Sequence, residues 1–299
     1  MKQQIFLLAT AAVLLTSCSN NEIEVETISN GRIALQVKSG ITRASGNQWD
    51  DGDQIGIFMT TANTADNREN VGYTTTKGGT SSTFNATEPT NTIYFPVNGD
   101  EATFEAYYPY RAALENGKKY NITLNDQSSQ RAIDLMVATP VTSTKLNPNV
   151  GFVFGHKLSK LDLTIKGDGK VVTDEMLSGM SITLGAFNRL GSYNIKTGEL
   201  MIATDVGTPP VALPVAADGK HAEAIVLPGT QLSQLTLKLK LVGIENPFTC
   251  KLETALNKTT DTGKKYNYTI TFNGTEIGLS STVTDWAPGN GAGDEVVVE

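Results

Sequence analysis

The second half of the chain contains the clearest alternation of apolar and polar positions. Residues 161–166 and 235–241 alternate leucine or isoleucine with polar residues, and residues 266–272 do the same with tyrosine, isoleucine and phenylalanine. A period of two puts successive side chains on opposite faces of a β-strand. Each segment is therefore expected to be a strand with one buried face.

The same alternation occurs near the start of the chain. Residues 32–38 place Ile33, Leu35 and Val37 on one face, which predicts a half-buried first strand. Residues 40–47 are mostly small and polar and are flanked by glycine, so they are expected to form an exposed linker. A turn and a second strand are expected next, over residues 49–53 and 54–59.

Further strand-like segments predict an all-β protein. In the first half they lie at residues 92–97, 103–108, 120–124 and 133–138. Helical spacing is sustained nowhere, and only residues 173–178 look locally helical, with Thr173 as the N-cap.

Chain length and strand spacing indicate two β-sandwich domains in tandem. Residues 139–149 are rich in proline, asparagine, threonine and serine and form the candidate boundary. The N-terminal sandwich is expected over residues 32–148 and the C-terminal sandwich over residues 149–299. The second is expected to end in a flexible C-terminal tail, whose final residues 294–299 could form a strand.

The first residues have the features of an export signal. Lys2 precedes an apolar run over residues 5–15, and Leu15-Thr16-Ser17 leads directly to Cys18. This run is too short to span a bilayer, and its end resembles the bacterial lipobox, in which the cysteine is acylated. We therefore expect a lipoprotein signal peptide over residues 1–17, lipid on Cys18, and an acidic tether over residues 18–31.

Composition gives little sign of chemistry. A net charge of −7 argues against a nucleic-acid partner, which requires a basic surface. The sequence contains no phosphate-binding loop, dinucleotide fingerprint or serine nucleophile elbow, so no cofactor is expected. Cys250 is the only cysteine besides Cys18 and is expected to be buried and inert.

Few residues could hold a metal, and none is expected. His156 and His221 stand alone in the sequence, and His156 between apolar neighbours is expected to be a packed structural residue. Asp50, Asp51 and Asp53 faintly resemble a calcium loop, but the rest of that pattern is absent. A turn stabilised by local hydrogen bonds is the favoured interpretation.

Several aromatic residues in the first half could either stack on a sugar or pack in a core. Core packing is favoured, because aromatic side chains are common in strands and interiors. Alternation places Phe104 and Tyr108 on one face and Tyr107 on the other. The candidates are Tyr94, Phe95, Tyr107, Tyr108 and Tyr110.

Three segments together resemble the fimbrillin family, whose members are subunits of pili derived from lipoproteins. The first is Thr42-Arg43-Ala44 followed by residues 49–59, which run from Trp49 through Asp50-Asp51-Gly52-Asp53 to Met59. The second is residues 152–161, and the third joins residues 266–270 to Thr284-Asp285-Trp286. Each is weakly specific alone, but the three occur in the family's order behind a lipobox.

This resemblance implies two tandem transthyretin-like β-sandwich domains and a non-enzymatic role in a cell-surface fimbrium. It implies transport to the outer membrane as a lipoprotein, then cleavage between Arg43 and Ala44 that releases the strand bearing Ile33, Leu35 and Val37. A strand from another pilus subunit would fill the vacated groove.

Several alternatives remain open from the sequence. Arg43 could be an ordinary solvated residue, and Arg32 is a second, less favoured cleavage site. A shaft, tip or anchor position, the donor strand and any adhesion ligand are all undetermined. The rival function is an outer-membrane glycan-binding lipoprotein with an exposed aromatic row, and a hydrolase with two convergent carboxylates ranks third.

Overall fold

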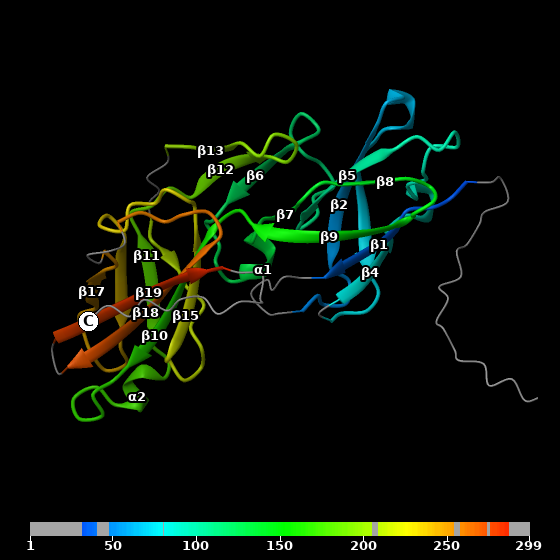
Figure 1. Cartoon of the computed structure of the whole chain (residues 1–299). Helices are drawn as coiled ribbons and strands as arrows, with labels where there is room; N and C mark the ends of the chain where they lie inside the picture. The colour runs from blue at the N-terminus through cyan, green and yellow to red at the C-terminus, as the bar shows by residue number, and fades with distance from the viewer. Residues whose placement is uncertain are drawn as a thin grey trace, which may run out of the picture.

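The computed structural model describes residues 32–40, 48–79, 81–204, 209–253, 258–273 and 276–286. These residues form two lobes that lie side by side, and β-strands dominate both (Figure 1). The prediction of an all-β fold is confirmed. The buried apolar residues fall into two clusters, one within the first lobe and a larger one that fills the second.

The first lobe is a ring of strands. Its members are β1 (Gln36–Gly40), β2 (Gln54–Thr61), β3 (Arg68–Thr75), β4 (Ser81–Ala86), β5 (Ala102–Tyr108), β7 (Met136–Ala138), β8 (Val141–Ser143) and β9 (Asn149–His156). The order is β2-β3-β4-β1-β9-β7-β5, β5 pairs again with β2, and β8 pairs with the start of β5. Because β5 pairs with β2, the ladder closes on itself around the first core.

The second lobe consists mainly of two four-stranded sheets. One has the order β15 (His221–Val226), β10 (Ser159–Lys166), β18 (Lys264–Asn273), β19 (Glu276–Asp285). The other has the order β14 (Val211–Ala212), β11 (Ser181–Gly185), β16 (Thr236–Lys240), β17 (Phe248–Lys251). Alternate side chains of both sheets are buried in one cluster, as the period-two patterns predicted. Examples are Leu163, Tyr268, Leu184 and Leu237.

A small third sheet lies beside this sandwich. It has the order β13 (Leu200–Ile202), β12 (Leu190–Asn194), β6 (Lys119–Thr123). The strand expected at residues 120–124 is therefore present, but it pairs with β12 and its Tyr120 and Ile122 belong to the second cluster. The domain prediction had placed this strand within the N-terminal sandwich, residues 32–148.

Helical structure is confined to single turns in the described residues. They are α1 (Gln130–Ile133), α2 (Asp174–Leu177), η1 (Thr64–Asp66) and η2 (Pro89–Asn91). Thr173 is the N-cap of α2, as predicted. Residues 133–138 are not one strand, because Ile133 ends α1 and only Met136–Ala138 join the ladder as β7.

The change from one sheet system to the other does not lie at residues 148 and 149. β9 begins at Asn149, and it pairs with β1 and β7 in the ring of the first lobe. The first sheet of the second lobe begins only at Ser159. Strand pairing thus changes from the first lobe to the second between His156 and Ser159, whereas the predicted domain boundary lies between residues 148 and 149.

The two lobes share an apolar contact at the end of β5. Tyr108 and Phe104 belong to the first cluster, whereas Tyr107 belongs to the second, together with Phe58 of β2 and Val137 of β7. The predicted alternation of these three aromatic residues is confirmed. Two consecutive residues of β5, Tyr107 and Tyr108, are thus buried in different hydrophobic cores.

Candidate functional site

The first strand, β1, is one of the strands of the ring and is hydrogen-bonded to a neighbouring strand along each of its edges. β1 is antiparallel to β4, with Val37 opposite Phe84, and parallel to β9, with Gln36 opposite Asn149 (Figure 1). β4 and β9 have no pairing with each other. In the ladder that the structure describes, β1 is therefore the strand that lies directly between β4 and β9.

Alternate side chains of this strand point into the first core. Leu35 is 5% exposed, Val37 is 2% exposed and Ser39 is fully buried. The hydroxyl of Ser39 donates a hydrogen bond to the carbonyl oxygen of Phe152 at 3.3 Å. Lys38 is exposed and Ile33 half-buried, so the predicted inward face is confirmed and Ser39 extends it by one position.

The chain before β1 is held by a neighbouring loop. The amide of Leu35 donates to the carbonyl oxygen of Ile93, and the amide of Phe95 donates to that of Ile33, at 2.9 and 3.0 Å. The guanidinium of Arg32 lies 4.3 Å from the centre of the Tyr94 ring. The chain is therefore already held to the first lobe from Arg32 onward, before β1 begins at Gln36.

The segment that follows the linker is fixed to the ring by a tryptophan. Trp49 is 1% exposed, and its amide and carbonyl groups exchange hydrogen bonds of 2.9 Å with those of Gly79. Its ring makes edge contacts with Phe84 of β4, Tyr108 of β5 and Phe154 of β9, at centroid distances of 5.0, 5.4 and 5.6 Å. Sequence reasoning placed this residue in a turn and did not find its core position.

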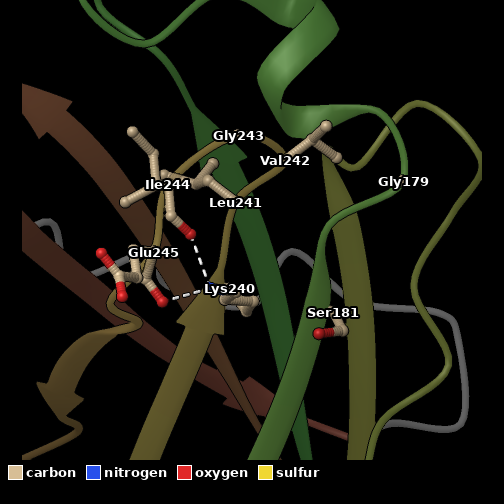
Figure 2. A pocket seen from close by; sticks show the side chains of 8 residues that line it. All are labelled: Gly179, Ser181, Lys240, Leu241, Val242, Gly243, Ile244 and Glu245. Atoms are coloured by element: carbon tan, nitrogen blue, oxygen red, sulfur yellow. Dashed lines mark hydrogen bonds between the residues drawn. The ribbon is translucent and has the colours of Figure 1, made fainter.

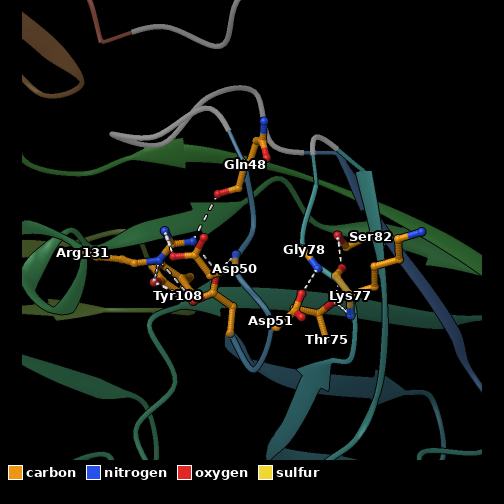
Figure 3. A network of polar contacts seen from close by, with 10 residues as sticks. Gln48, Asp50, Asp51, Thr75, Lys77, Gly78, Ser82, Tyr108 and Arg131 are labelled. Atoms are coloured by element: carbon orange, nitrogen blue, oxygen red, sulfur yellow. Dashed lines mark hydrogen bonds and ion pairs between the residues drawn. The ribbon is translucent and has the colours of Figure 1, made fainter.

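Arg131 of α1 binds the same segment through a polar network (Figure 3). Its guanidinium contacts a carboxylate oxygen of Asp50 and one of Asp53, each at 2.5 Å, and donates to the carbonyl oxygen of Gln48 at 3.1 Å. The hydroxyl of Tyr108 donates to Asp53 at 3.2 Å. Burial and the negative charge of Asp53 raise the pKa of Tyr108, so the phenol remains a proton donor.

The aspartates of this turn therefore have protein partners. Asp50 and Asp53 bind Arg131, and a carboxylate oxygen of Asp51 accepts a hydrogen bond from the amide of Gly78. Carboxylates neutralised by a guanidinium are poor ligands for calcium, because that ion needs several free oxygen atoms. The interpretation of these residues as a hydrogen-bonded turn agrees with the geometry.

Three predicted site residues cannot be placed. Cys18, Arg43 and Ala44 lie outside the described residues. Cleavage and lipidation at these positions stay predictions from the sequence. The described chain ends at Gly40 before the linker and resumes at Gln48 after it.

The two histidines are in different surroundings. His156 is buried, as predicted; its Nδ1 lies 2.9 Å from a carboxylate oxygen of Asp134, and its ring stacks on Trp286 at 3.9 Å. His221 is partly exposed, and its Nε2 lies 2.9 Å from a carboxylate oxygen of Asp162.

Asp162, His221 and Glu223 form a cluster that could in principle hold a metal. Lys265 binds Asp162 at 2.8 Å, however, and Lys160 binds Glu223 at 2.6 Å. The two ammonium groups balance the two carboxylates, so a cation would have to displace them. The same pairing makes these carboxylates a poor acid and base pair for a hydrolase.

The five candidate aromatic residues do not form an exposed row. Phe95, Tyr107 and Tyr108 are buried, whereas Tyr94 and Tyr110 are half-buried beside a hollow of about 370 Å³. The predicted core packing is thus confirmed for three of them. A flat aromatic face of the kind that the glycan-binding rival requires is absent from the described surface.

Another hollow, of about 420 Å³, lies where the chain turns after β16 (Figure 2). The ammonium of Lys240 donates to the carbonyl oxygens of Ile244 and Glu245, and Glu245 also lines the hollow. Val242, 48% exposed, supplies an apolar wall. This hollow holds no histidine or cysteine and offers no evident chemistry.

Among the described residues, the structure has no helix that is both long and apolar enough to cross a bilayer. Cys250 is 7% exposed, which confirms the predicted burial. Burial raises the pKa of its thiol above the ordinary value, so the reactive thiolate is disfavoured.

Comparison with known proteins agrees with the resemblance seen in the sequence. A family model described as fimbrillin-like matches residues 42–286. A protein of Bacteroides uniformis that carries the name of a fimbrium subunit, Fim1C, is 39% identical over 301 residues, which are 98% of each chain.

Solved structures share the fold. A crystal structure from Bacteroides uniformis, described as that of a cell adhesion protein, superposes with a TM-score of 0.78 at 36% identity and covers 87% of this chain and 100% of that one. A second from Bacteroides ovatus has a TM-score of 0.69 at 24% identity and covers 85% and 98%. Because the family model spans most of the chain and Fim1C aligns almost from end to end, the chain belongs to the fimbrillin-like family.

Proposed function

We propose that this protein is a structural, non-enzymatic subunit of a cell-surface fimbrium that assembles by donor-strand exchange. The observation that carries the proposal is the position of β1 between β4 and β9, which do not pair with each other. If β1 leaves, both neighbours lose a hydrogen-bonding partner and the first core loses one wall. A strand from another subunit can restore both, as in strand addition to a sheet edge.

The groove left by β1 would restrict both the side chains and the direction of the strand that can fill it. Its floor includes Phe84 and Phe152, and the departing strand fills it with Leu35, Val37 and Ser39. An incoming strand therefore needs apolar residues at two alternate positions and a small residue at the third. To reproduce the ladder it must also run antiparallel to β4 and parallel to β9.

Processing would connect this exchange to export. In this proposal, lipid on Cys18 anchors the precursor in the outer membrane, and a protease then cuts between Arg43 and Ala44. One cut would release the lipid, the tether and β1 together, because all three precede it in the chain. A subunit that is not cut would keep its lipid and serve as an anchor.

The test is cleavage of the purified full chain, without its signal peptide, by an arginine-specific protease. We expect one early product that begins at Ala44 by mass and N-terminal sequencing, followed by association seen in size-exclusion chromatography. Arg43→Ala should abolish this cut, whereas Arg32→Ala, at an exposed arginine before β1, should leave it unchanged. A chain that resists the protease, or a cut chain that never associates with itself or with other fimbrial subunits, would argue against the proposal.

A further inference from the structure

Trp49 contacts both of the strands that flank β1. Its ring contacts Phe84 of β4 and Phe154 of β9, the two strands that β1 separates, and it also contacts Tyr108. Adjacent strands lie about 4.8 Å apart, so β4 and β9 are held roughly 10 Å from each other across β1. The indole is large enough to touch both from inside the ring.

The segment that carries this indole is anchored independently of β1. Arg131 holds Gln48 and Asp50 (Figure 3) and also binds Asp53. The backbone of Trp49 pairs with that of Gly79. Further bonds run from the amide of Gly52 to the carbonyl oxygen of Thr75 at 2.9 Å, and from the amide of Gly78 to Asp51. All these partners lie outside residues 32–40.

From this arrangement we propose that residues 48–53 are a latch that stays in place when β1 leaves and keeps the groove the width of one strand. Trp49 forms part of the floor of the groove, together with Phe84 and Phe152, and Arg131 is the positioning residue that holds Trp49 in place. This inference rests on the proposed function, because it gives the vacated groove a defined shape. A chain severed between Gly40 and Gln48 would lose only what precedes the cut.

Retention of the latch matters because an emptied groove can close. Two unpaired strand edges attract each other, and an apolar slot exposed to water favours collapse. A bulky ring in contact with both edges opposes such collapse and preserves the spacing that an incoming strand requires. Preorganisation of this kind improves binding by reducing the reordering needed on association.

The experiment uses the full chain with residues 41–47 replaced by the recognition site of a sequence-specific protease. After cleavage and removal of the released fragment, a fluorescein-labelled peptide of residues 32–40 is titrated and its anisotropy is followed. Arg131→Gln is compared with wild type, and Arg68→Gln is the matched control. Arg68 lies in the same lobe, and its guanidinium donates to backbone carbonyl groups of residues 65–67.

We expect Arg131→Gln to weaken peptide binding at least tenfold, Arg131→Lys to restore part of it, and Arg68→Gln to change it less than twofold. Thermal melts of the uncut variants show that each is folded. If Arg131→Gln does not fold, Asp50→Asn removes one ion pair of the same network, and its loss of binding is the substitute measure. In a chain with Trp286 replaced by phenylalanine, Trp49 is the remaining fluorescent tryptophan. Its wavelength of maximum emission should stay at the short value of a buried indole after the fragment is removed.

Equal peptide affinity in wild type and Arg131→Gln would overturn the latch, as would a red shift of Trp49 on release or a cut wild type that no longer binds the peptide. The result is separable from the proposed function, because cleavage here does not depend on Arg43. If the chain with the inserted protease site binds the peptide as expected but the natural chain resists cleavage at Arg43, the latch is supported. The cleavage step of the proposed function is then contradicted.

Discussion

Replacing Leu35 by alanine tests whether the first strand holds the first core together. Leu35 is 5% exposed and packs in the cluster enclosed by the ring, so the substitution removes three buried carbon atoms and leaves a cavity. Comparable Leu→Ala changes cost about 2–5 kcal/mol. Leu35 lies just before β1, where the chain can adjust, and so we expect about 2–3 kcal/mol, the lower part of that range.

The assay is urea unfolding of the full chain in a background where Trp286 is replaced by phenylalanine. The chain has 2 tryptophans, so Trp49 then reports on the first core alone. Lys38→Ala on the same strand is the control; its side chain is exposed, and it should change the free energy of unfolding by less than about 0.5 kcal/mol. A loss below about 1 kcal/mol for Leu35→Ala would refute the view that this strand seals the core.

Three further predictions address other parts of the molecule. Burial raises the pKa of Asp162, but its ammonium and imidazole partners outweigh this and the net pKa is lowered. Its carboxylate therefore stabilises the folded state above its unfolded pKa of about 4, and this contribution is lost as the pH falls through the lower folded-state pKa. Asp162→Asn should therefore reduce the free energy of unfolding at pH 7 and make its decline in acid less steep. Urea titrations between pH 7 and pH 2 would show both effects. Gly56→Ala should lower the free energy of unfolding by about 1–3 kcal/mol, because the new Cβ would overlap the ring of Tyr107. Gly151→Ala is the control and should change it little, because no atom lies within 4 Å of the position of the new Cβ. Calorimetry of both variants tests this difference. With the other cysteine changed to serine, Cys250 should react with a thiol reagent only as fast as the protein opens, and a rapid burst of labelling in the native state would contradict its burial.

Alternation in the sequence located several of the strands, such as β1, β5, β10 and β18, but not their partners, and it missed others, such as β3, β4 and β11. The buried positions Val150, Phe152 and Phe154 identify β9 as a strand, yet its partner β1 is more than a hundred residues away in the chain. Such pairing depends on the closure of the ring and leaves no local signal. For the same reason the pairing of β6 with β12 could not be predicted from the sequence.

The candidate site was predictable only in part. The inward face of Ile33, Leu35 and Val37 follows from a period of two, which is a local property. The network around Arg131 joins residues 78 to 83 positions apart and could not be read from spacing. Trp49 looked like part of a turn, because its neighbours are aspartate and glycine, and its burial depends on aromatic residues from three distant strands.

The neighbouring tyrosines of β5 have a mechanical consequence. Because Tyr107 is buried in one core and Tyr108 in the other, tension applied across the molecule cannot extend a slack linker between the lobes. It must instead shear a continuous apolar contact to which β2 and β7 also contribute through Phe58 and Val137. A protein built in this way should resist stretching as one unit, because its two lobes cannot separate without breaking this contact.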